Sequence, residues 1–138
     1  MQSTEEQVPI LDEALTSMGF TLLQTKQQVD ECIQRYASIL AFVDAQCGCA
    51  GNAARECMAM ALELSSKNPE RLVTAMVGSE DEAVEQLWEL SRPYPRTSPA
   101  IALIKDGIPI LHLERYQIKS IPPEELAHEL CHAMNTHC

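Results

Sequence analysis

The chain has 138 residues, of which 20 are acidic and 10 are lysine or arginine, so its formal net charge at pH 7 is −10. This charge argues against nucleic acid and anionic membranes as partners, because both select for clustered basic residues. Apolar residues make up 46%, a composition typical of a globular protein. We expect one soluble domain over residues 1–138, located in the cytoplasm, because neither a signal-peptide layout nor an apolar run of the ~20 residues that span a bilayer is present.

Predicted helices and strands alternate along the first part of the chain. Apolar residues at helical spacing predict a helix over residues 9–18 that Gly19 ends, and a short strand is expected over residues 21–23. Thr25 and Gln28 have the spacing of a capping box, which predicts the start of the next helix. The apolar run that follows is nearly continuous, which is typical of a central strand covered on both faces; it comprises residues 38–43.

The alternation continues into the second half. Residues 50–67 predict a helix and residues 71–77 a buried strand. Ser79 and Glu82 repeat the capping-box spacing in front of another predicted helix. Residues 91–99 hold three prolines and are therefore expected to form a loop.

A hairpin and a helix are expected to complete the chain. The apolar runs 100–104 and 108–113 are joined through an Asp-Gly pair, which supports the positive φ angles of the favoured hairpin turns. Pro122 and Pro123 introduce the last predicted helix. Strands separated by helices imply parallel pairing, so the sequence predicts an α/β fold in which a mixed sheet is covered by helices on both sides. In such sheets, functional groups cluster beyond the carboxyl ends of the central strands.

Cys47, Gly48 and Cys49 occupy that place, between the predicted central strand and the next predicted helix. Free N–H groups and the dipole at a helix N-terminus favour a thiolate over a thiol, so we expect redox chemistry and a low pKa for Cys47. We expect Gly48 to permit backbone angles that a side chain would penalise, so that the two cysteines can close a strained, easily reduced disulfide. The alternatives are two buried small residues in a turn, or half of a metal site.

The roles of the two cysteines are expected to differ. Cys47 leaves the strand first and is predicted to be the attacking nucleophile. Cys49 lies in the first helical turn, where we expect its sulfur to be less accessible. Asp44, which ends the predicted strand, is expected to cap or solvate the strand end; the alternative is that it deprotonates Cys49 during turnover.

The remaining cysteines and the histidines are predicted to lie outside this chemistry. Cys32, Cys57 and Cys131 lie on apolar helix faces and are expected to fill the core. Cys138 is expected to be exposed and mobile, and it is a candidate third redox thiol. Four histidines raise the alternative of a metal site, but they lack the HExxH pattern and are expected to lie on a solvated helix face; they are His112, His128, His132 and His137.

The chain resembles the bacilliredoxin family of small thioredoxin-like proteins. Three features carry the resemblance: a strand leading into CGCA, a proline-containing loop that continues as SPAIALIKDGIPILHL, and the terminal HC. It extends from about residue 11 to residue 138. The CGC of this chain corresponds to the CGC of the family, and Ala50 and Arg55 correspond to the residues that flank it. Pro99 matches the proline that is cis in thioredoxin-like folds and faces the active site, so we expect a cis Ser98–Pro99 bond within reach of the CGC sulfurs.

The resemblance implies a thioredoxin-like three-layer sandwich and a thiol–disulfide oxidoreductase. The family removes bacillithiol, a low-molecular-weight thiol, from S-thiolated client proteins and has some disulfide isomerase activity. The dithiol carries the electrons, so no organic cofactor or metal is expected; a disulfide reductase is an expected further partner.

Three positions depart from the related patterns. Gln46 stands where thioredoxins carry a tryptophan, Ala41 where they carry a buried aspartate, and Glu56 where the family proline is expected. The rival function is a non-catalytic metal-binding or redox-sensing module that uses the CGC cysteines with Cys138 or His137.

Overall fold

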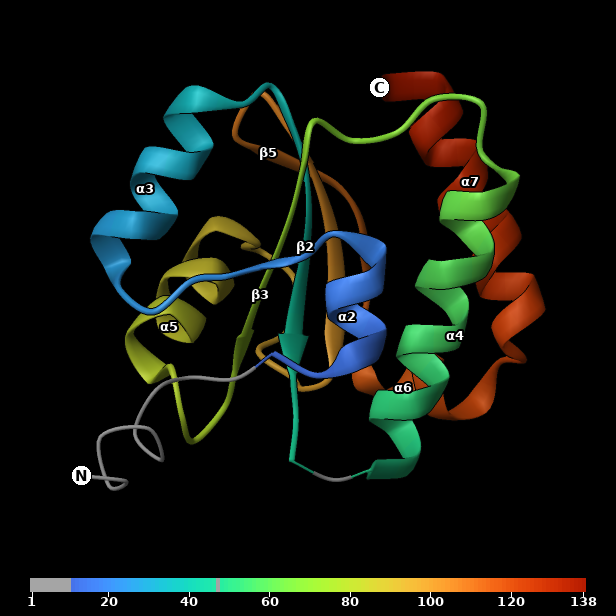
Figure 1. The fold of residues 1–138 in the computed structure, drawn as a ribbon, viewed down its shortest axis with the longest axis horizontal. Helices are drawn as coiled ribbons and strands as arrows, with labels where there is room; N and C mark the ends of the chain where they lie inside the picture. Colours follow the sequence, from blue (N-terminus) through green and yellow to red (C-terminus); the bar gives the residue numbers. More distant parts are fainter. Residues whose placement is uncertain (1–10, 47) are drawn as a thin grey trace.

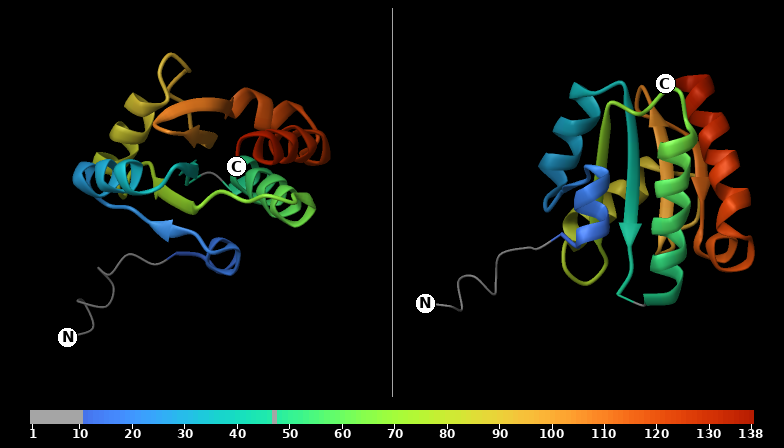
Figure 2. Two further views of the ribbon diagram at one scale, coloured as in Figure 1. Left: turned by 90° about the horizontal axis from the view of Figure 1, so that it is seen from above. Right: turned by 45° about the vertical axis from the view of Figure 1, so that its right-hand side comes forward.

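A five-stranded mixed sheet lies between two layers of helices (Figures 1 and 2). The computed structural model describes residues 11–46 and 48–138. The strand order is β1-β3-β2-β4-β5, in which β1, β3 and β2 are parallel, β4 is antiparallel to β2, and β5 is antiparallel to β4. The strands are β1 (Thr21–Leu22), β2 (Ser38–Asp44), β3 (Arg71–Met76), β4 (Ala100–Lys105) and β5 (Ile108–Leu113). The predicted α/β architecture is confirmed.

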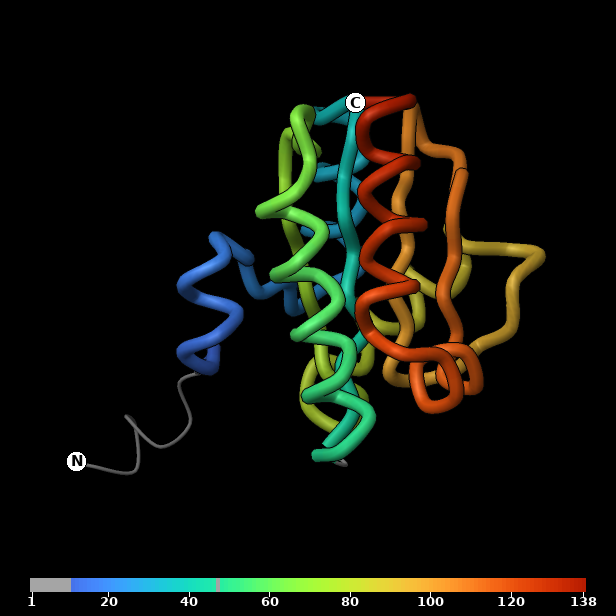
Figure 3. The backbone as a smooth tube through the Cα atoms, turned by 90° about the vertical axis from the view of Figure 1, so that its right-hand side faces the viewer, coloured from blue at the N-terminus to red at the C-terminus, as the bar shows by residue number. Residues whose placement is uncertain are grey.

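The helices divide between the two faces of the sheet. One face carries α3 (Lys26–Arg35) and α5 (Asp81–Leu90), and the other carries α4 (Gly48–Leu64) and α7 (Pro123–His137). Figure 3 looks onto the face that α4 and α7 cover. Two short helices join this second layer: α2 (Glu13–Met18) and α6 (Arg115–Ser120).

Strand β2 contributes to both cores. All of its residues are buried, as its apolar sequence predicts. Successive side chains of a strand point to opposite faces. Leu40 and Phe42 therefore enter the core under α4 and α7, whereas Ile39, Ala41 and Val43 enter the core under α3 and α5.

The predicted ends of the first helices are partly corrected. Asp12 is the N-cap of α2 and accepts the N–H of Leu15 at 2.9 Å, so the helix begins at Glu13, and Pro9 lies outside the described residues. Gly19, with φ of 97°, ends this helix as predicted. The capping box at the start of α3 is also confirmed.

The capping box predicted before α5 is wrong. Gly78 has a φ of 92° and reverses the chain, and its N–H is bound by the Asp81 carboxylate at 2.6 Å. The helix consequently begins at Asp81. The carboxylate of Glu82 instead accepts the N–H of Lys26 at 2.8 Å and so ties α5 to α3.

Other boundaries differ by a few residues, and one helix was not predicted. α4 begins at Gly48 and ends at Leu64, whereas the prediction was residues 50–67, and β3 ends at Met76. Helix α6 follows β5 directly and was missed because it has only 6 residues. The residue that could have indicated the start of this helix in the sequence is Gln117, whose side chain accepts the N–H of Glu114 at 2.9 Å.

The hairpin between β4 and β5 forms as predicted. Asp106 and Gly107 have φ of 51° and 80°, the left-handed angles of a hairpin turn. The register shifts between Leu103 and Ile104, close to Pro109, which has no N–H to donate. The Ser98–Pro99 bond is cis, as predicted, and the Arg92–Pro93 bond is also cis.

His112 is a buried titratable ring, which departs from the prediction that the histidines lie on a solvated helix face. It belongs to β5 and stacks on Tyr94 of the proline-rich loop, with ring centroids 4.9 Å apart and planes 9° apart. Burial lowers the pKa of His112 below its ordinary value, because the charged form loses its water. His128, His132 and His137 are exposed on α7, as predicted.

We predict that His112 makes the protein less stable as the pH falls. Since its folded pKa is depressed, its contribution is complete above about pH 6.5, the unfolded pKa, and is lost as the pH falls through the folded pKa. The free energy of unfolding, measured by urea denaturation between pH 7 and pH 5, should fall less in His112→Phe, which keeps an aromatic ring against Tyr94. His132→Asn, on the exposed face of α7, is the control and should behave as the native chain. Equal pH dependence in all three proteins would contradict the prediction.

Candidate active site

The candidate site lies where β2 ends and α4 begins. Gln46 precedes the CGC segment and is exposed, and Gly48 is the first residue of α4. Cys47 lies outside the described residues, so its predicted accessibility and pKa stay predictions. The helix N-terminus expected directly after Cys47 is present, and its first N–H groups have no partners within the helix.

Cys49 is exposed. Whether it is less accessible than Cys47, as predicted, stays a prediction, because Cys47 lies outside the described residues. The buried face of α4 begins one residue after Cys49, at Ala50 and Gly51, and continues at Ala54. Gly48 and Cys49 thus extend beyond the part of the helix that packs on the sheet. Cys49 is therefore open to solvent.

Gly48 does not have the positive φ that a side chain would penalise, although such backbone angles were expected of it. The glycines with positive φ among the described residues are Gly19, Gly78 and Gly107. A Cβ built on Gly48 would meet no heavy atom within 4 Å. The position as described therefore has room for a side chain.

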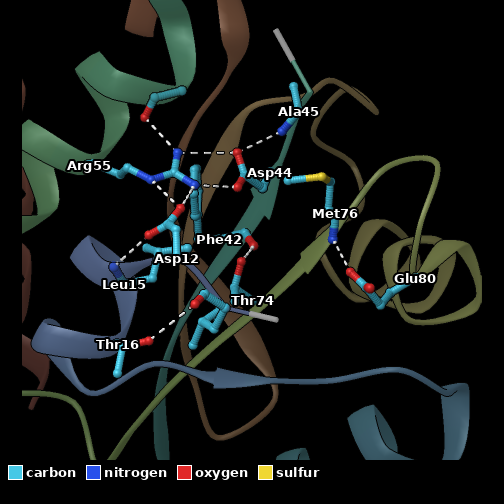
Figure 4. Close-up of polar contacts among 12 residues, drawn as sticks. Asp12, Leu15, Thr16, Phe42, Asp44, Ala45, Arg55, Thr74, Met76 and Glu80 are labelled. Carbon is cyan, nitrogen blue, oxygen red and sulfur yellow. Dashed lines mark hydrogen bonds and ion pairs between the residues drawn. The ribbon is translucent and has the colours of Figure 1, made fainter. Parts of the chain in front are cut away.

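A buried ion pair lies immediately beneath the site (Figure 4). Asp44 is the last residue of β2, and only 3% of its side chain is exposed. Its Oδ2 lies 2.5 Å from Nη2 of Arg55 on α4, and its Oδ1 accepts the N–H of Ala45 at 2.8 Å. The guanidinium also contacts the carboxylate of Asp12, at the start of α2. Arg55 thereby joins α2, β2 and α4 at the edge of the sheet that carries CGC.

Asp44 therefore forms an ion pair with Arg55 in addition to the predicted capping of the strand end. The Arg55 guanidinium lies 5.3 Å from the ring centroid of Phe42, which adds a cation–π contact on its other side. Burial alone would lower the pKa of Arg55, but hydrogen bonds to Asp44 and Asp12 outweigh it and raise the pKa. Partial burial alone would raise the pKa of Asp12, but the hydrogen bonds from Arg55 and from the N–H of Leu15 hold it below its usual value. Arg55 and Asp12 are thus held in their charged forms.

Gly51 gives this ion pair the space it needs. The Nη1 of Arg55 donates to the carbonyl of Gly51 at 3.0 Å and to Oδ1 of Asp44 at 3.3 Å. A Cβ on Gly51 would lie 3.1 Å from that nitrogen and 3.5 Å from Oδ1 of Asp44. Because the guanidinium is held by acceptors on several sides, it cannot move aside easily.

We predict unequal roles for the two carboxylates bound to Arg55. Arg55→Met should lower the free energy of unfolding by about 3–5 kcal/mol, because it leaves the buried Asp44 without its cation. Asp12→Asn should cost at most about 1 kcal/mol, since 45% of the Asp12 side chain is exposed. Urea denaturation at pH 7 measures both. The double variant Asp44→Asn, Arg55→Met should recover part of the loss, and similar losses for Arg55→Met and Asp12→Asn would contradict the assignment.

The two glycines of the first turns of α4 provide a matched test of the packing. Gly48→Ala should be neutral or stabilising by up to about 1 kcal/mol, the gain in helix propensity. Gly51→Ala should instead destabilise by about 1–3 kcal/mol, because the added methyl group presses on the guanidinium of Arg55. Thermal and urea unfolding of the two variants would show the difference, and the prediction is wrong if they respond alike.

Pro99 lies at the same edge of the sheet. It is buried directly before β4, and the Ser98 carbonyl in its cis bond accepts a hydrogen bond from Nη1 of Arg115 at 2.9 Å. The backbone N–H of Arg115 also donates to the Thr97 hydroxyl at 3.2 Å. Arg115 was not predicted as a site residue, because this contact joins a loop to the unpredicted helix α6. The reach of Pro99 to the sulfur of Cys47 lies outside the described residues.

Two cysteines fill the core, as predicted, and a third does so in part. Cys32 is buried between α3 and the sheet, and burial raises its pKa. Cys57 is fully buried under α4, and its burial raises its pKa to about 12. Cys131 is half-buried beside the same core, and its sulfur accepts a weak contact from Nδ2 of Asn135 at 3.6 Å.

Cys138 lies at the other end of the molecule. Contrary to the prediction that it is exposed, it is half-buried, and its N–H donates to the carbonyl of Met134 at 2.8 Å. Burial raises its pKa, although a hydrogen bond with Ser38 opposes the shift. Ser38 begins β2, whereas the CGC segment follows its end, and a strand of 7 residues spans roughly 20 Å. Figure 1 shows the C-terminus and the start of α4 at opposite ends of the sheet.

This separation bears on the metal alternative. His137 lies beside Cys138, so a site that combined either residue with Cys49 would need ligands from both ends of the sheet. Within residues 11–46 and 48–138, no three histidine, cysteine, aspartate or glutamate side chains are grouped to hold a metal ion.

Over the same ranges, no helix is both long and apolar enough to cross a bilayer.

Comparisons with known proteins agree on the fold and the family. A family model described as disulphide isomerase matches residues 4–138. The bacilliredoxin of Staphylococcus epidermidis is 36% identical over 120 residues, which cover 87% of this chain and 82% of the relative. The bacilliredoxin of Bacillus cereus is 35% identical over 126 residues, covering 91% and 87%.

The structural likeness extends to more distant proteins. A chain described as an oxidoreductase with a thioredoxin fold superposes with a TM-score of 0.62 at 12% identity, covering 83% of this chain and 96% of that one. Fasciola hepatica thioredoxin gives a TM-score of 0.56 at 20% identity, covering 85% and 98%. These likenesses define a thioredoxin-fold protein. The chain belongs to the bacilliredoxin family, and this membership supports an oxidoreductase-type role.

Proposed function

We propose that this chain is a thiol–disulfide oxidoreductase of the bacilliredoxin type, which removes a small thiol from S-thiolated proteins through Cys47 and Cys49. One observation carries the proposal: Cys49 is exposed in the first turn of a helix of 17 residues that follows the buried central strand. Cys47 directly precedes this helix, and the dipole at a helix N-terminus favours the thiolate, which is the attacking form. Membership of the bacilliredoxin family supports the same chemistry.

The proposed reaction is a pair of thiol–disulfide exchanges. The thiolate of Cys47, which directly precedes α4, attacks the small-thiol sulfur of the mixed disulfide. The client leaves as a thiolate, and the small thiol stays bound to Cys47. Cys49 then attacks the Cys47 sulfur, which releases the small thiol and forms the CGC disulfide. Two further small thiols, which leave as their own disulfide, or a disulfide reductase, return the pair to the dithiol form, so the dithiol itself carries the two electrons of the exchange.

The exposure of Cys49 suits the second exchange. An exposed sulfur can approach the adduct without opening the core, and an external thiol can compete with it for the same adduct. Attack of Cys47 on a disulfide within a client, followed by attack of another client thiol on the resulting mixed disulfide, would isomerise client disulfides. The setting proposed for this activity is the reducing cytoplasm, where such mixed disulfides are substrates rather than stable structure.

We predict distinct losses for the two site cysteines. Cys47→Ser should abolish release of the client thiol, because it removes the nucleophile. Cys49→Ser should still complete one turnover and accumulate a small-thiol adduct on Cys47, detectable by intact-protein mass spectrometry. Cys138→Ser, at the opposite end of the sheet, should keep its rate within about twofold.

Two outcomes would change the proposal. An active Cys47→Ser protein with the adduct on Cys49 would reverse the two roles. Unchanged activity in both site variants would falsify the CGC mechanism. A native chain that carries stoichiometric zinc protecting both thiols would support the metal-binding rival instead.

A further inference from the structure

A hollow of about 250 Å³ lies between the end of α3, β1 and the start of β3. Figure 1 shows the end of α3 and the start of β3 at the end of the sheet opposite to the start of α4, so the length of β2 separates this hollow from the candidate active site. We call it the Tyr36 hollow; the lining residues that matter here are Leu22, Leu23, Glu31, Arg35, Tyr36 and Arg71.

Two arginines meet one aromatic ring in the Tyr36 hollow. The guanidinium carbon of Arg35 lies 5.6 Å from the ring centroid of Tyr36, and that of Arg71 lies 5.4 Å from the same centroid. A guanidinium that stacks on a ring uses its face for this contact and keeps the N–H groups at its edge available for oxygen ligands. Both arginines are exposed, so a ligand from solvent can reach them.

Neither guanidinium is neutralised by a carboxylate within residues 11–46 and 48–138. The last turn of a helix favours a cation, which accounts for Arg35 at the end of α3. Arg71 begins a strand, and strands have only small net dipoles. The two cations nevertheless lie against the same ring in a chain whose net charge is −10.

Glu31 is the acidic residue among those that line the hollow, and its carboxylate is bound elsewhere. Its Oε2 accepts a hydrogen bond from Nε2 of Gln27, one turn earlier on α3, at 3.1 Å. Glu31 is exposed and also lines a neighbouring hollow along α3. Its negative charge opposes an anion in the Tyr36 hollow, so its removal should have the opposite effect to removal of an arginine.

We propose that the Tyr36 hollow is a second binding site, in which Arg35 and Arg71 bind the phosphate dianion of a small ligand. Planar guanidinium groups donate pairs of parallel N–H···O hydrogen bonds, and two such groups match the several oxygen atoms and the double charge of phosphate. Leu22 and Leu23 add an apolar wall, and the volume of the hollow suits inorganic phosphate or a small phosphate monoester. The site is independent of the thiol exchange proposed for CGC.

An NMR titration of the full chain, labelled with ¹⁵N, tests the proposal. Inorganic phosphate and phenyl phosphate are added at about pH 7.5, where a phosphate monoester is largely dianionic, with sodium chloride of equal ionic strength as the reference. Saturable shifts are expected in the backbone amides of Leu22, Leu23, Tyr36 and Arg71. Phenyl phosphate should bind more tightly, because its ring packs on the leucines; equal affinities would identify the free ion as the ligand, and both results support the site.

Substitutions of opposite effect separate this site from general changes in charge. Arg71→Gln should raise the Kd for phenyl phosphate about five- to tenfold, because it removes charge-assisted hydrogen bonds to the ligand. Glu31→Gln should lower the Kd about two- to threefold, because it removes the opposing charge. The control is Lys119→Gln, which changes an exposed residue of α6 at the other end of the sheet and alters the net charge as Arg71→Gln does; its Kd should equal that of the native chain.

Cys32 offers a second measurement in the native chain, because it lines the same hollow. Burial raises the pKa of Cys32, and the charge of Arg71 opposes this shift. A bound dianion neutralises that charge and covers the thiol, so phenyl phosphate should slow the alkylation of Cys32 by iodoacetamide, followed by peptide mass spectrometry. Cys49, at the opposite end of the sheet, is the internal control and should react at an unchanged rate.

Three results would overturn the assignment. Chloride could produce the same shifts as phosphate, which would mean that the ions only screen charges. Arg71→Gln and Lys119→Gln could weaken binding equally, which would mean that net charge alone attracts the anion. Alkylation of Cys32 at the same rate with and without saturating phenyl phosphate would mean that the ligand lies elsewhere.

Discussion

Asp44 ends a strand that is buried along its whole length, so folding removes its carboxylate from water together with the rest of the strand. An unpaired charge in this position would be strongly destabilising, so a cation must reach it from a neighbouring element. Arg55 supplies that charge from the third turn of α4, over the ring of Phe42, and continues to Asp12 at the start of α2. The same contact therefore sets the position of α4 against the sheet and brings α2 onto it.

This constraint explains the geometry of the site. The guanidinium of Arg55 returns a hydrogen bond to the carbonyl of Gly51, so the second turn of α4 is held close to the end of β2. Gly51 must lack a side chain for this approach. Gly48 and Cys49 precede the packed part of the helix and remain exposed. Burial at Asp44 and exposure at Cys49 are thus two consequences of the same helix placement.

Local patterns predicted most of the fold. The apolar run of β2 indicated a doubly covered strand, and Asp106 with Gly107 indicated the hairpin turn, because both signals depend on neighbouring residues alone. The missed features join distant segments: Arg55 to Asp12, and Arg115 to Ser98. The pattern CGC predicted a site between a central strand and a helix, and β2 and α4 are present there. The pattern could not show which residues of the first turn face solvent, since that depends on where α4 packs.

The described cysteines lie in different surroundings, and these surroundings determine how readily each thiol can react. A thiol reacts as its thiolate, and burial in apolar surroundings disfavours that form. Cys57 illustrates this with a pKa of about 12, and burial also raises the pKa values of Cys32 and Cys138. Cys138 is further separated from Cys49 by the length of the sheet, so the fold itself opposes an intramolecular disulfide between them. A protein that exchanges disulfides with other chains must prevent its own thiols from forming wrong pairs. Here the core protects Cys32 and Cys57, and distance protects Cys138, while Cys49 remains exposed.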